Sequence, residues 1–394
     1  MQKKLIPYLA SLISILAFLS CTKDEIANYE LTLEQKKILN TIPEPAIIAH
    51  RGTCYWAPEG TEAAMRWARN AGATYLECDL QRTKDGYLVV FHDVRLTRTT
   101  DIMTKYPNQG TSPISDFTLE ELFNLDIGSW FNYTYPSKAR TSFKNLDILT
   151  LEDLIKIAEG YKIQRNASHD RIYQKINGRI ITQYELDPAD NGNRPGIYVE
   201  TKEPDLYPGI EIDLKNELDR LGWYSDNVST LKSIMTKPGH IHIANTQARV
   251  IVQTFSQASL KKLRQAFPRL IPMCYLIGIS AQKDVSKETY SQWLNFAIRE
   301  GAVIIGPCIY EEDGLLGDLL KPWMHDLIKE KGLLIHAYTF KSKEQIINYL
   351  DMVDGFFTNE ADDLLSFLLK SNKINLNNSN NTMTGSYILD VLGY

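Results

Sequence analysis

Residues 47–52 read Ile-Ile-Ala-His-Arg-Gly, residues 75–80 read Tyr-Leu-Glu-Cys-Asp-Leu, and residues 89–93 read Val-Val-Phe-His-Asp. Each apolar run is closed by polar residues, the pattern of buried strands that carry catalytic groups at their ends. Similar runs predict eight strands at 46–49, 75–80, 196–202, 249–255, 271–276, 303–307, 333–339 and 355–358. Amphipathic stretches between them predict helices at 61–70, 151–159, 210–221, 259–267, 287–300, 322–331, 343–350 and 361–369.

The alternation of strands and helices defines the expected fold. Eight strand–helix units predict an α/β protein whose parallel strands close into a TIM (β/α)8 barrel. An open doubly wound sheet is the alternative, although no GxGxxG turn follows the first expected strand. Four glycines stand just past expected helices, where a left-handed C-cap is needed: Gly72, Gly222, Gly301 and Gly332.

Two long segments interrupt the repeat. Residues 94–148 follow the second strand region and contain a group of aromatic residues, Trp130, Phe131, Tyr133 and Tyr135. A segment of this length predicts a small subdomain, and we expect an inserted cap over the barrel mouth. Its aromatic residues either cover the substrate or pack the cap. A second, polar insertion spans residues 162–195.

The N-terminal residues differ from the rest of the chain. Lys3 and Lys4 precede an apolar run, residues 5–19, that is typical of a signal peptide. Ser20 before Cys21 resembles a bacterial lipobox, which implies cleavage, lipidation of Cys21, export and anchoring to the membrane of the cell envelope. The alternative is an ordinary secretory signal with an incidental cysteine. The expected organisation is a signal peptide (1–20), a tether (22–44), the barrel (45–370, with insertion 94–148) and a polar tail (371–394).

Bulk composition restricts the class of protein. A chain of 394 residues, 44% of them hydrophobic, can bury a full core. The net charge of −5 gives no basic surface, so nucleic acid is not an expected partner. The other cysteines form no CxxC pair, and we interpret them as small buried hydrophobes: Cys54, Cys78, Cys274 and Cys308.

Three carboxylates stand at the ends of two expected strands. Glu77 and Asp79 are two residues apart, so their side chains point to the same face of one strand. Glu200 and Lys202 repeat this spacing on the next barrel strand. Converging carboxylates repel one another unless a cation lies among them, and oxygen ligands suit Mg²⁺, Ca²⁺ or Mn²⁺. The alternative for Glu77 and Asp79 is a charged strand end that makes surface hydrogen bonds.

Two histidines stand at the ends of neighbouring apolar runs. His50 and His92 are each followed by a polar partner, Arg51 and Asp93. Two imidazoles supply a general acid and a general base near neutral pH. The Arg51 guanidinium matches phosphate oxygens, and Lys202 adds a second positive charge. The pattern predicts acid/base chemistry on an anionic substrate.

Together these motifs resemble those of the glycerophosphodiester phosphodiesterase family, over residues 47–362. The early motifs are His50-Arg51-Gly52, Pro58-Glu59, Glu77-x-Asp79, Thr83-Lys84-Asp85-Gly86, His92-Asp93 and Glu200-Thr201-Lys202. The later ones are Leu149-Thr150-Leu151-Glu152-Asp153-Leu154, His336-Ala337-Tyr338-Thr339 and Asp354-Gly355-Phe356-Phe357-Thr358-Asn359. Three positions depart from the family pattern, with Gly60, Tyr338 and Asn359 where Asn, Trp and Asp are usual, which leaves substrate preference open.

The resemblance implies a TIM-barrel enzyme that hydrolyses glycerophosphodiesters to sn-glycerol 3-phosphate and an alcohol. It implies one divalent cation, Ca²⁺ or Mg²⁺, as the cofactor. By similarity the residues take four roles: cation ligands Glu77, Asp79 and Glu200; acid and base His50 and His92, in either order; substrate or phosphate contacts Arg51, Lys202 and Tyr338; and a supporting second layer at Glu59.

Two other functions stay open from the sequence. One is a related barrel phospholipase that acts on intact phospholipid, for which an exposed apolar lip would be expected; the polar cap favours a small soluble diester. The other is a catalytically inactive surface lipoprotein that binds other envelope components. Such a relative would have lost a cation ligand or a histidine, and this chain keeps all five.

Overall fold

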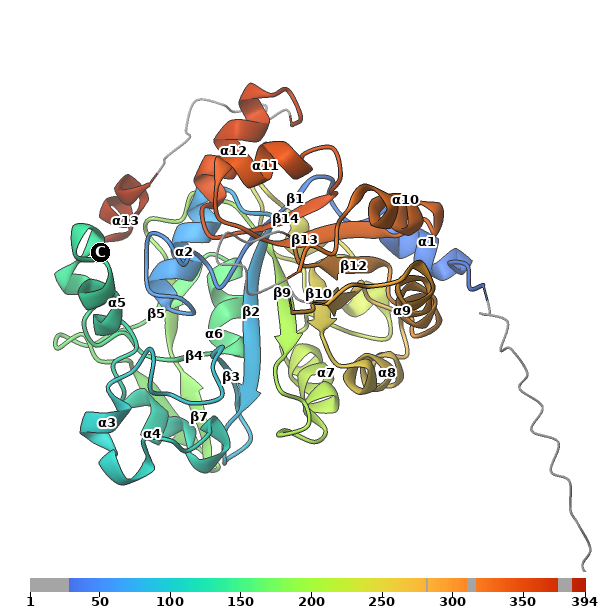
Figure 1. The fold of residues 1–394 in the computed structure, drawn as a ribbon. Helices are drawn as coiled ribbons and strands as arrows, with labels where there is room; N and C mark the ends of the chain where they lie inside the picture. Colours follow the sequence, from blue (N-terminus) through green and yellow to red (C-terminus); the bar gives the residue numbers. More distant parts are fainter. Residues whose placement is uncertain (1–27, 281–282, 310–316, 375–384) are drawn as a thin grey trace, which may run out of the picture.

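The computed structural model describes residues 28–280, 283–309, 317–374 and 385–394 (Figure 1). Within these residues eight parallel strands close into a barrel in the order β1-β14-β13-β12-β11-β10-β9-β2, and β2 pairs back onto β1. The strands are β1 (Ala46–Ala49), β2 (Tyr75–Arg82), β9 (Gly196–Thr201), β10 (Val250–Thr254), β11 (Met273–Ile277), β12 (Ile304–Pro307), β13 (Leu334–Phe340) and β14 (Gly355–Thr358). The predicted TIM barrel is confirmed, and each expected strand overlaps an observed one.

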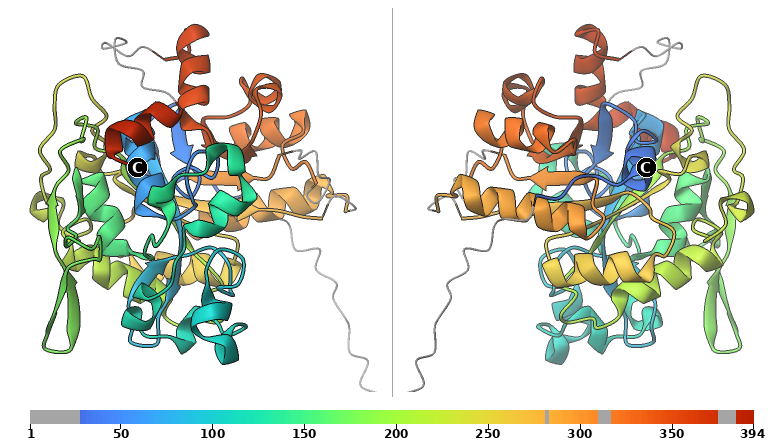
Figure 2. Two further views of the ribbon diagram at one scale, coloured as in Figure 1. Left: turned by 90° about the vertical axis from the view of Figure 1, so that its left-hand side faces the viewer. Right: turned by 90° about the vertical axis from the view of Figure 1, so that its right-hand side faces the viewer.

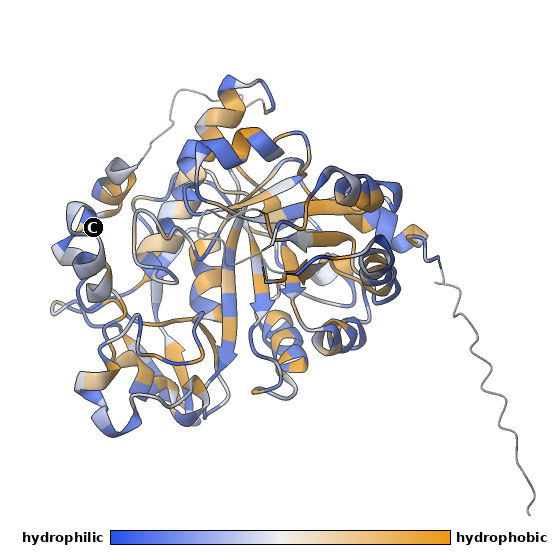
Figure 3. Cartoon of the chain, in the orientation of Figure 1, coloured by the Kyte–Doolittle hydropathy of each residue, from blue (hydrophilic) through white to orange (hydrophobic). Residues whose placement is uncertain are grey.

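Helices follow the strands around the outside of the barrel. They are α2 (Glu62–Ala71), α6 (Leu151–Ala158), α7 (Ile210–Arg220), α8 (Gln257–Ala266), α9 (Lys287–Arg299), α10 (Pro322–Glu330), α11 (Lys343–Tyr349) and α12 (Ala361–Lys370). Hydrophobic residues are concentrated in the strands, and hydrophilic residues cover the outer helices and loops (Figure 3). The four predicted cap glycines all have positive φ angles, from 72° at Gly332 to 95° at Gly72.

Aromatic side chains fill the barrel interior on the amino-terminal side of the polar strand ends. The Tyr198 ring of β9 contacts Phe357 of β14, with ring centroids 5.0 Å apart, and Tyr75 of β2, at 5.7 Å. The Tyr198 hydroxyl also lies 3.2 Å from Nδ1 of His336 on β13. Since β9 does not pair with β13 or β14, the contacts of Tyr198 with His336 and Phe357 cross the barrel interior. His336 is therefore a buried core residue and forms part of the floor beneath the polar strand ends.

The first insertion forms the expected subdomain between β2 and α6. Strand β3 (Leu88–Val90) pairs antiparallel with β2, and β4 (Leu149–Thr150) pairs antiparallel with β3 at the edge of the sheet. Between them lie α3 (Ile102–Lys105), η1 (Pro107–Gln109), η2 (Ile114–Asp116), α4 (Leu119–Phe123), α5 (Ser129–Thr134), η3 (Pro136–Lys138) and η4 (Thr141–Phe143). Phe131 is fully buried against Phe143, whereas Tyr133 is 84% exposed, so one aromatic packs the cap and the other faces solvent.

The second insertion, between α6 and β9, forms two small antiparallel sheets. One pairs β5 (Tyr161–Ile163) with β8 (Tyr184–Leu186), and the other pairs β6 (Tyr173–Ile176) with β7 (Arg179–Thr182). These strands lie outside the barrel sheet and leave its eight-strand closure unchanged. A deeply buried ion cluster joins the segment after β8 to α2: Asp187 accepts hydrogen bonds from Arg66 and Arg69.

The expected tether packs partly on the barrel. Helix α1 (Leu33–Leu39) buries Ile38, and the buried Gln35 amide donates hydrogen bonds to the carbonyls of Ile298 and Ala302. Residues 1–27, with the expected signal peptide and Cys21, lie outside the described part of the chain. No helix among the described residues is long and apolar enough to cross a membrane.

The expected polar tail also differs from the structure at its end. Helix α13 (Ser386–Leu392) packs against α2 and buries Ile388 and Leu389 (Figure 2). Arg140 of the cap donates to Asp390 and to the carbonyl of Tyr394. The polar composition of residues 371–384 concealed this short amphipathic helix, which joins the barrel to the cap.

Candidate active site

The three predicted carboxylates lie together at the carboxyl ends of two paired strands. Asp79 of β2 is the register partner of Glu200 on β9, and Glu77 lies one pleat below, opposite Tyr198. Their exposed fractions are 2% for Glu77, 3% for Asp79 and 6% for Glu200. Because residues two apart share a face, the carboxylates stand directly above the aromatic floor of the barrel.

The charges of this cluster are strongly coupled. Burial, and then the charge of Asp79, raises the pKa of Glu77 above its usual range and the pKa of Glu200 to about 8. Burial would also raise the pKa of Asp79, but the cations Lys202 and Arg51 outweigh it and lower that pKa. The Lys202 Nζ lies 3.5 Å from Asp79 Oδ1 and 3.2 Å from Glu200 Oε1. The two cations therefore do not offset the burial and mutual repulsion of three charged carboxylates, and the pKa values of Glu77 and Glu200 stay raised.

The donor set suits a hard divalent cation. Glu77, Asp79 and Glu200 supply carboxylate oxygens, and the buried Gln253 Oε1 has no hydrogen-bond partner among the described residues. The amide of Gln253 donates from Nε2 to Glu77 Oε1 over 2.9 Å. Lys202 bridges two of the carboxylates, and no group of three His, Cys, Asp or Glu side chains within the described residues has the mutual spacing of a metal-coordination shell. The residues fit a cation in type and burial, and to bind one the Lys202 ammonium would have to leave Asp79 and Glu200.

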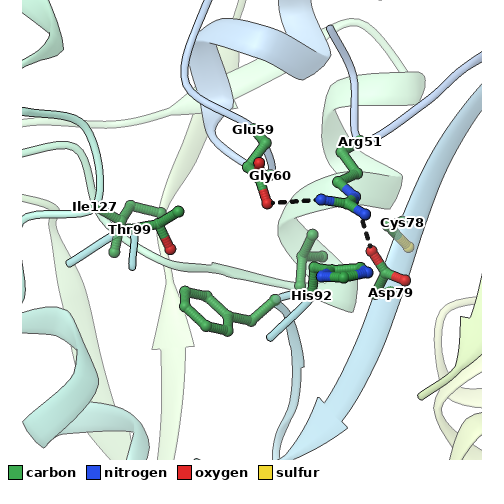
Figure 4. A pocket seen from close by; sticks show the side chains of 10 residues that line it. Arg51, Glu59, Gly60, Cys78, Asp79, His92, Thr99 and Ile127 are labelled. Atoms are coloured by element: carbon green, nitrogen blue, oxygen red, sulfur yellow. Dashed lines mark hydrogen bonds and ion pairs between the residues drawn. The ribbon is translucent and has the colours of Figure 1, made fainter. Parts of the chain in front are cut away.

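Arg51 is positioned by a left-handed turn after β1. Its own φ is +52° and that of Gly52 is +86°. A Cβ on Gly52 would lie 2.8 Å from the carbonyl carbon of Ala64, so the turn requires glycine. The Arg51 backbone N–H donates to Glu77 Oε2 over 2.7 Å. Its guanidinium lies between Glu59, at 3.0 Å, and Asp79, at 3.5 Å (Figure 4).

Each predicted catalytic histidine has one ring nitrogen held by a side-chain acceptor. His50 Nδ1 lies 2.8 Å from Asn359 Oδ1, and His92 Nδ1 lies 2.7 Å from Asp93 Oδ1. Burial, and then the charge of Arg51, lowers the pKa of His50 to about 3, so its imidazole is neutral at pH 7. His92 lines the same small pocket as Arg51 and Asp79 (Figure 4). Both imidazoles lie close enough to Asp79 to lower its pKa, so the fold places near one carboxylate two histidines that are 42 positions apart in the chain.

Arg98 connects the two halves of this pocket, and the sequence reasoning missed it. Its guanidinium donates to Asp93 Oδ2 over 2.6 Å and to Glu59 Oε1 over 2.7 Å. Asp93 in turn holds His92, and Glu59 holds Arg51. Arg98 comes from the cap insertion, where no local pattern distinguishes it from the neighbouring Arg95.

Replacing Arg98 with methionine should lower kcat about 10- to 100-fold. Without Arg98, the acid/base and phosphate-binding side chains are no longer aligned with the reacting atoms. Arg98→Lys keeps one positive charge but loses the paired donors of the planar guanidinium. We therefore expect its kcat to lie between those of the wild type and Arg98→Met. Steady-state kinetics with the melting temperature as a folding check measure this effect. Arg299→Met, which removes an exposed arginine paired with Glu300, is the matched control. Equal rates for both methionine variants would exclude a positioning role.

Tyr338 and a second aromatic residue form one wall of the barrel mouth. The Tyr338 hydroxyl donates to the Ile277 carbonyl over 2.9 Å, and its ring meets Phe255 edge-on at 5.7 Å. Phe255 is 44% exposed just after β10, and Lys202 Nζ lies 6.0 Å from its ring centroid. An exposed aromatic at a strand end was the available sequence signal for Phe255. The four cysteines of the described residues are unpaired thiols, and all except Cys54 are buried.

The mouth of this parallel barrel joins two imidazoles, three carboxylates and two basic side chains, Arg51 and Lys202. This is the architecture of a TIM-barrel hydrolase. The sequence matches the model of the glycerophosphoryl diester phosphodiesterase family over residues 50–363. The chain belongs to the glycerophosphoryl diester phosphodiesterase family, and it is an enzyme of that class.

Individual relatives agree with this assignment. The chain is 31% identical over 319 residues to the glycerophosphodiester phosphodiesterase of Bacillus subtilis, covering 80% of this chain and 83% of the relative. It is 25% identical over 327 residues to the enzyme of the same description from Caldanaerobacter subterraneus, covering 82% and 98%. A phosphodiesterase from Oleispira antarctica, solved in complex with the product sn-glycerol-3-phosphate, shares the fold with a TM-score of 0.51 and 20% identity, over 82% of this chain and 96% of that one.

Proposed function

We propose that this enzyme hydrolyses glycerophosphodiesters to sn-glycerol 3-phosphate and an alcohol by two-histidine acid/base catalysis with one divalent cation. The observation that carries the proposal is the pair of imidazoles at one barrel mouth, each with Nδ1 held by its own acceptor. Support also comes from relatives named for this activity.

The hydrogen-bond partner of each histidine holds the ring so that Nε2 can exchange a proton. The Asn359 carbonyl accepts from His50 Nδ1, which leaves the lone pair of Nε2 available for a proton. The Asp93 carboxylate holds His92 Nδ1 and stabilises a positive ring. His50 and His92 supply the acid and the base of the first step, in either order.

The reaction then proceeds in two balanced steps. One imidazole takes the proton of a glycerol hydroxyl, whose oxygen attacks phosphorus, while the other protonates the departing alcohol oxygen as its bond to phosphorus breaks. Water next attacks the cyclic phosphate and gives its proton to the second imidazole, while the first imidazole returns its proton to the glycerol oxygen as that oxygen leaves phosphorus. Both histidines end in their starting states.

Arg51, Lys202 and the divalent cation face the substrate phosphate in this proposal. Arg51 and Lys202 bind its oxygens, and Arg51 Nε is a buried donor without a hydrogen-bond partner among the described residues. Glu77, Asp79 and Glu200 hold the divalent cation, Ca²⁺ or Mg²⁺, with Lys202 turning from the carboxylates to the phosphate. When bound, the cation supplies positive charge that stabilises the developing charge on phosphorus oxygens.

Metal removal should abolish turnover. The purified full-length protein, incubated with glycerophosphoglycerol or glycerophosphocholine, should release glycerol 3-phosphate, and EDTA should reduce the rate at least about 100-fold. Adding Ca²⁺ or Mg²⁺ back should restore the rate. Glu77→Gln should raise the cation concentration needed for half-maximal rate, whereas Glu288→Gln, at an exposed site, should not.

Two results would count against this function. Release that persists in EDTA would exclude the divalent cation while retaining the hydrolase. Folded, metal-loaded protein that releases no glycerol 3-phosphate from either diester would exclude glycerophosphodiesters as substrates, and intact phospholipid would be tested next.

We further propose that the enzyme is exported and anchored to the bacterial envelope through lipid on Cys21. The support is the apolar run 5–19 and the small residue before Cys21. Cys21→Ser should move the enzyme from the membrane fraction to the soluble fraction after cell lysis and abolish incorporation of labelled fatty acid. Unchanged membrane association and labelling of the variant would exclude this anchor.

A further inference from the structure

Three aromatic side chains surround one ammonium group at the edge of the cap. Lys138 Nζ lies 3.0 Å from the ring centroid of Tyr55, 5.3 Å from that of Tyr135 and 5.9 Å from that of Trp56. The Tyr55 and Trp56 rings meet edge-on at 5.0 Å. Rings within about 6 Å of a cation attract it, and several such rings together form the sites that recognise quaternary ammonium groups. We call Tyr55, Trp56 and Tyr135 the aromatic cage.

The aromatic cage lies beside the catalytic pocket. Tyr55 belongs to the loop that starts at His50, and Cys54 Sγ of that loop is 3.9 Å from His50 Nδ1. On the other side, Glu360, whose charge acts on Lys138, directly follows Asn359, the partner of His50. The cap supplies Lys138 and Tyr135. Loops after β1 and β14 therefore meet the cap here, next to His50.

Lys138 is held in the cage by weak contacts. Its one hydrogen bond to a described residue is donated to the carbonyl of Tyr55 over 3.1 Å, and it forms no ion pair within the described residues. Tyr55 and Tyr135 are 37% and 38% exposed, so the cage opens to solvent. A cation–π contact at an exposed site changes an equilibrium constant by a factor of about two to five. The Lys138 ammonium can therefore leave the cage at modest cost, but it competes with any other cation.

We propose that the aromatic cage receives the alcohol part of the substrate, and that Lys138 within it selects neutral polyhydroxy alcohols over alcohols that carry a quaternary ammonium. This inference rests on the proposed diester hydrolysis and adds its substrate class. The Lys138 ammonium offers up to three donors to hydroxyl groups of a polyol. A quaternary ammonium has no such donor or acceptor, and it is repelled by the lysine charge until Lys138 withdraws.

The test compares two diesters with the same full-length enzyme. Values of kcat/KM for glycerophosphoglycerol and glycerophosphocholine are measured for the wild type, Lys138→Met, and Lys138→Met combined with Tyr55→Leu. The wild type should prefer the glycerol diester. Lys138→Met should shift the ratio toward the choline diester at least about fivefold, and adding Tyr55→Leu should abolish most of that shift.

The substrate ratio separates the cage from other effects. Loss of one positive charge near the phosphate lowers kcat/KM for both diesters by the same factor. This effect therefore cancels in the ratio of the two kcat/KM values. Lys144→Met, at an exposed lysine of the same cap, is the matched control and should leave the ratio unchanged. An unchanged ratio in Lys138→Met, or a shift that persists without the Tyr55 ring, would overturn the inference. A wild type that turns over neither diester would instead contradict the proposed function.

Discussion

Replacing His92 with alanine should lower kcat by about 10²- to 10⁴-fold while leaving the melting temperature unchanged. The expected loss is that of one acid/base catalyst. His92 is linked through Nδ1 to Asp93, at 2.7 Å, and its removal deletes proton transfer without touching the carboxylates of β2 and β9. Since the His92 side chain is 29% exposed, folding should not depend on it.

The matched control is His169→Ala, which removes an exposed histidine of the second insertion. Its kcat should equal that of the wild type. Asp93→Asn should reduce the rate less than His92→Ala, because the ring remains but its positive form loses a carboxylate partner. A His92→Ala enzyme with a nearly unchanged kcat would rule out the two-histidine mechanism.

Replacing Asp187 with asparagine should destabilise the protein by about 3–5 kcal/mol at pH 7. The Asp187 side chain has no exposed surface and accepts from Arg66 Nε and Nη2, both at 2.8 Å, and from Arg69 Nη2, at 2.5 Å. Removing its charge leaves two buried guanidiniums without their shared counter-ion. Urea unfolding followed by circular dichroism measures the loss.

The effect of Asp187 depends on pH in a definite direction. Burial would raise its pKa, but hydrogen bonds and charge from Arg66 and Arg69 outweigh this and lower the pKa to about 2. Because the folded value lies below the unfolded value of about 3.9, the carboxylate stabilises the fold above pH 4, and this stabilisation is lost as the pH falls toward 2. The difference in free energy of unfolding between the wild type and Asp187→Asn should therefore decrease as the pH falls.

Asp351→Asn is the matched control for that experiment. Asp351 is paired with Lys373 at the surface, where its side chain is 81% exposed. An exposed ion pair of this kind contributes about 0–1 kcal/mol. If Asp187→Asn lowered the free energy of unfolding no more than Asp351→Asn does, the Asp187 cluster would not stabilise the packing of the second insertion on α2.

Local patterns predicted the barrel and part of its site. The run 75–80 is apolar with charged residues at alternate positions, so it specified both a strand and a shared face for Glu77 and Asp79. Helix ends were visible at glycines such as Gly72, which adopts a φ of 95°. These features are local: strand period, helix period and cap geometry are encoded within a few neighbouring residues.

Contacts between distant residues were not predictable in this way. Gln253 donates to Glu77 across 176 positions, and Arg98 reaches Glu59 across 39. Helix α13 was missed because a polar stretch precedes it and its apolar face is only one turn or two long. No spacing rule in one sequence relates such pairs, since their distance depends on barrel closure and on where the cap docks.

The sequence by itself determined the alternation of eight strands and helices, the strand-end carboxylates and histidines, and hence the family. Only the tertiary structure decided that Asn359 holds His50, that Arg98 links Glu59 to Asp93, and that Lys138 lies in the aromatic cage. The physical reason is the range of the interactions. Backbone periodicity and apolar burial act between near neighbours along the chain, whereas directional hydrogen bonds and cation–π contacts act across space, after the chain has closed.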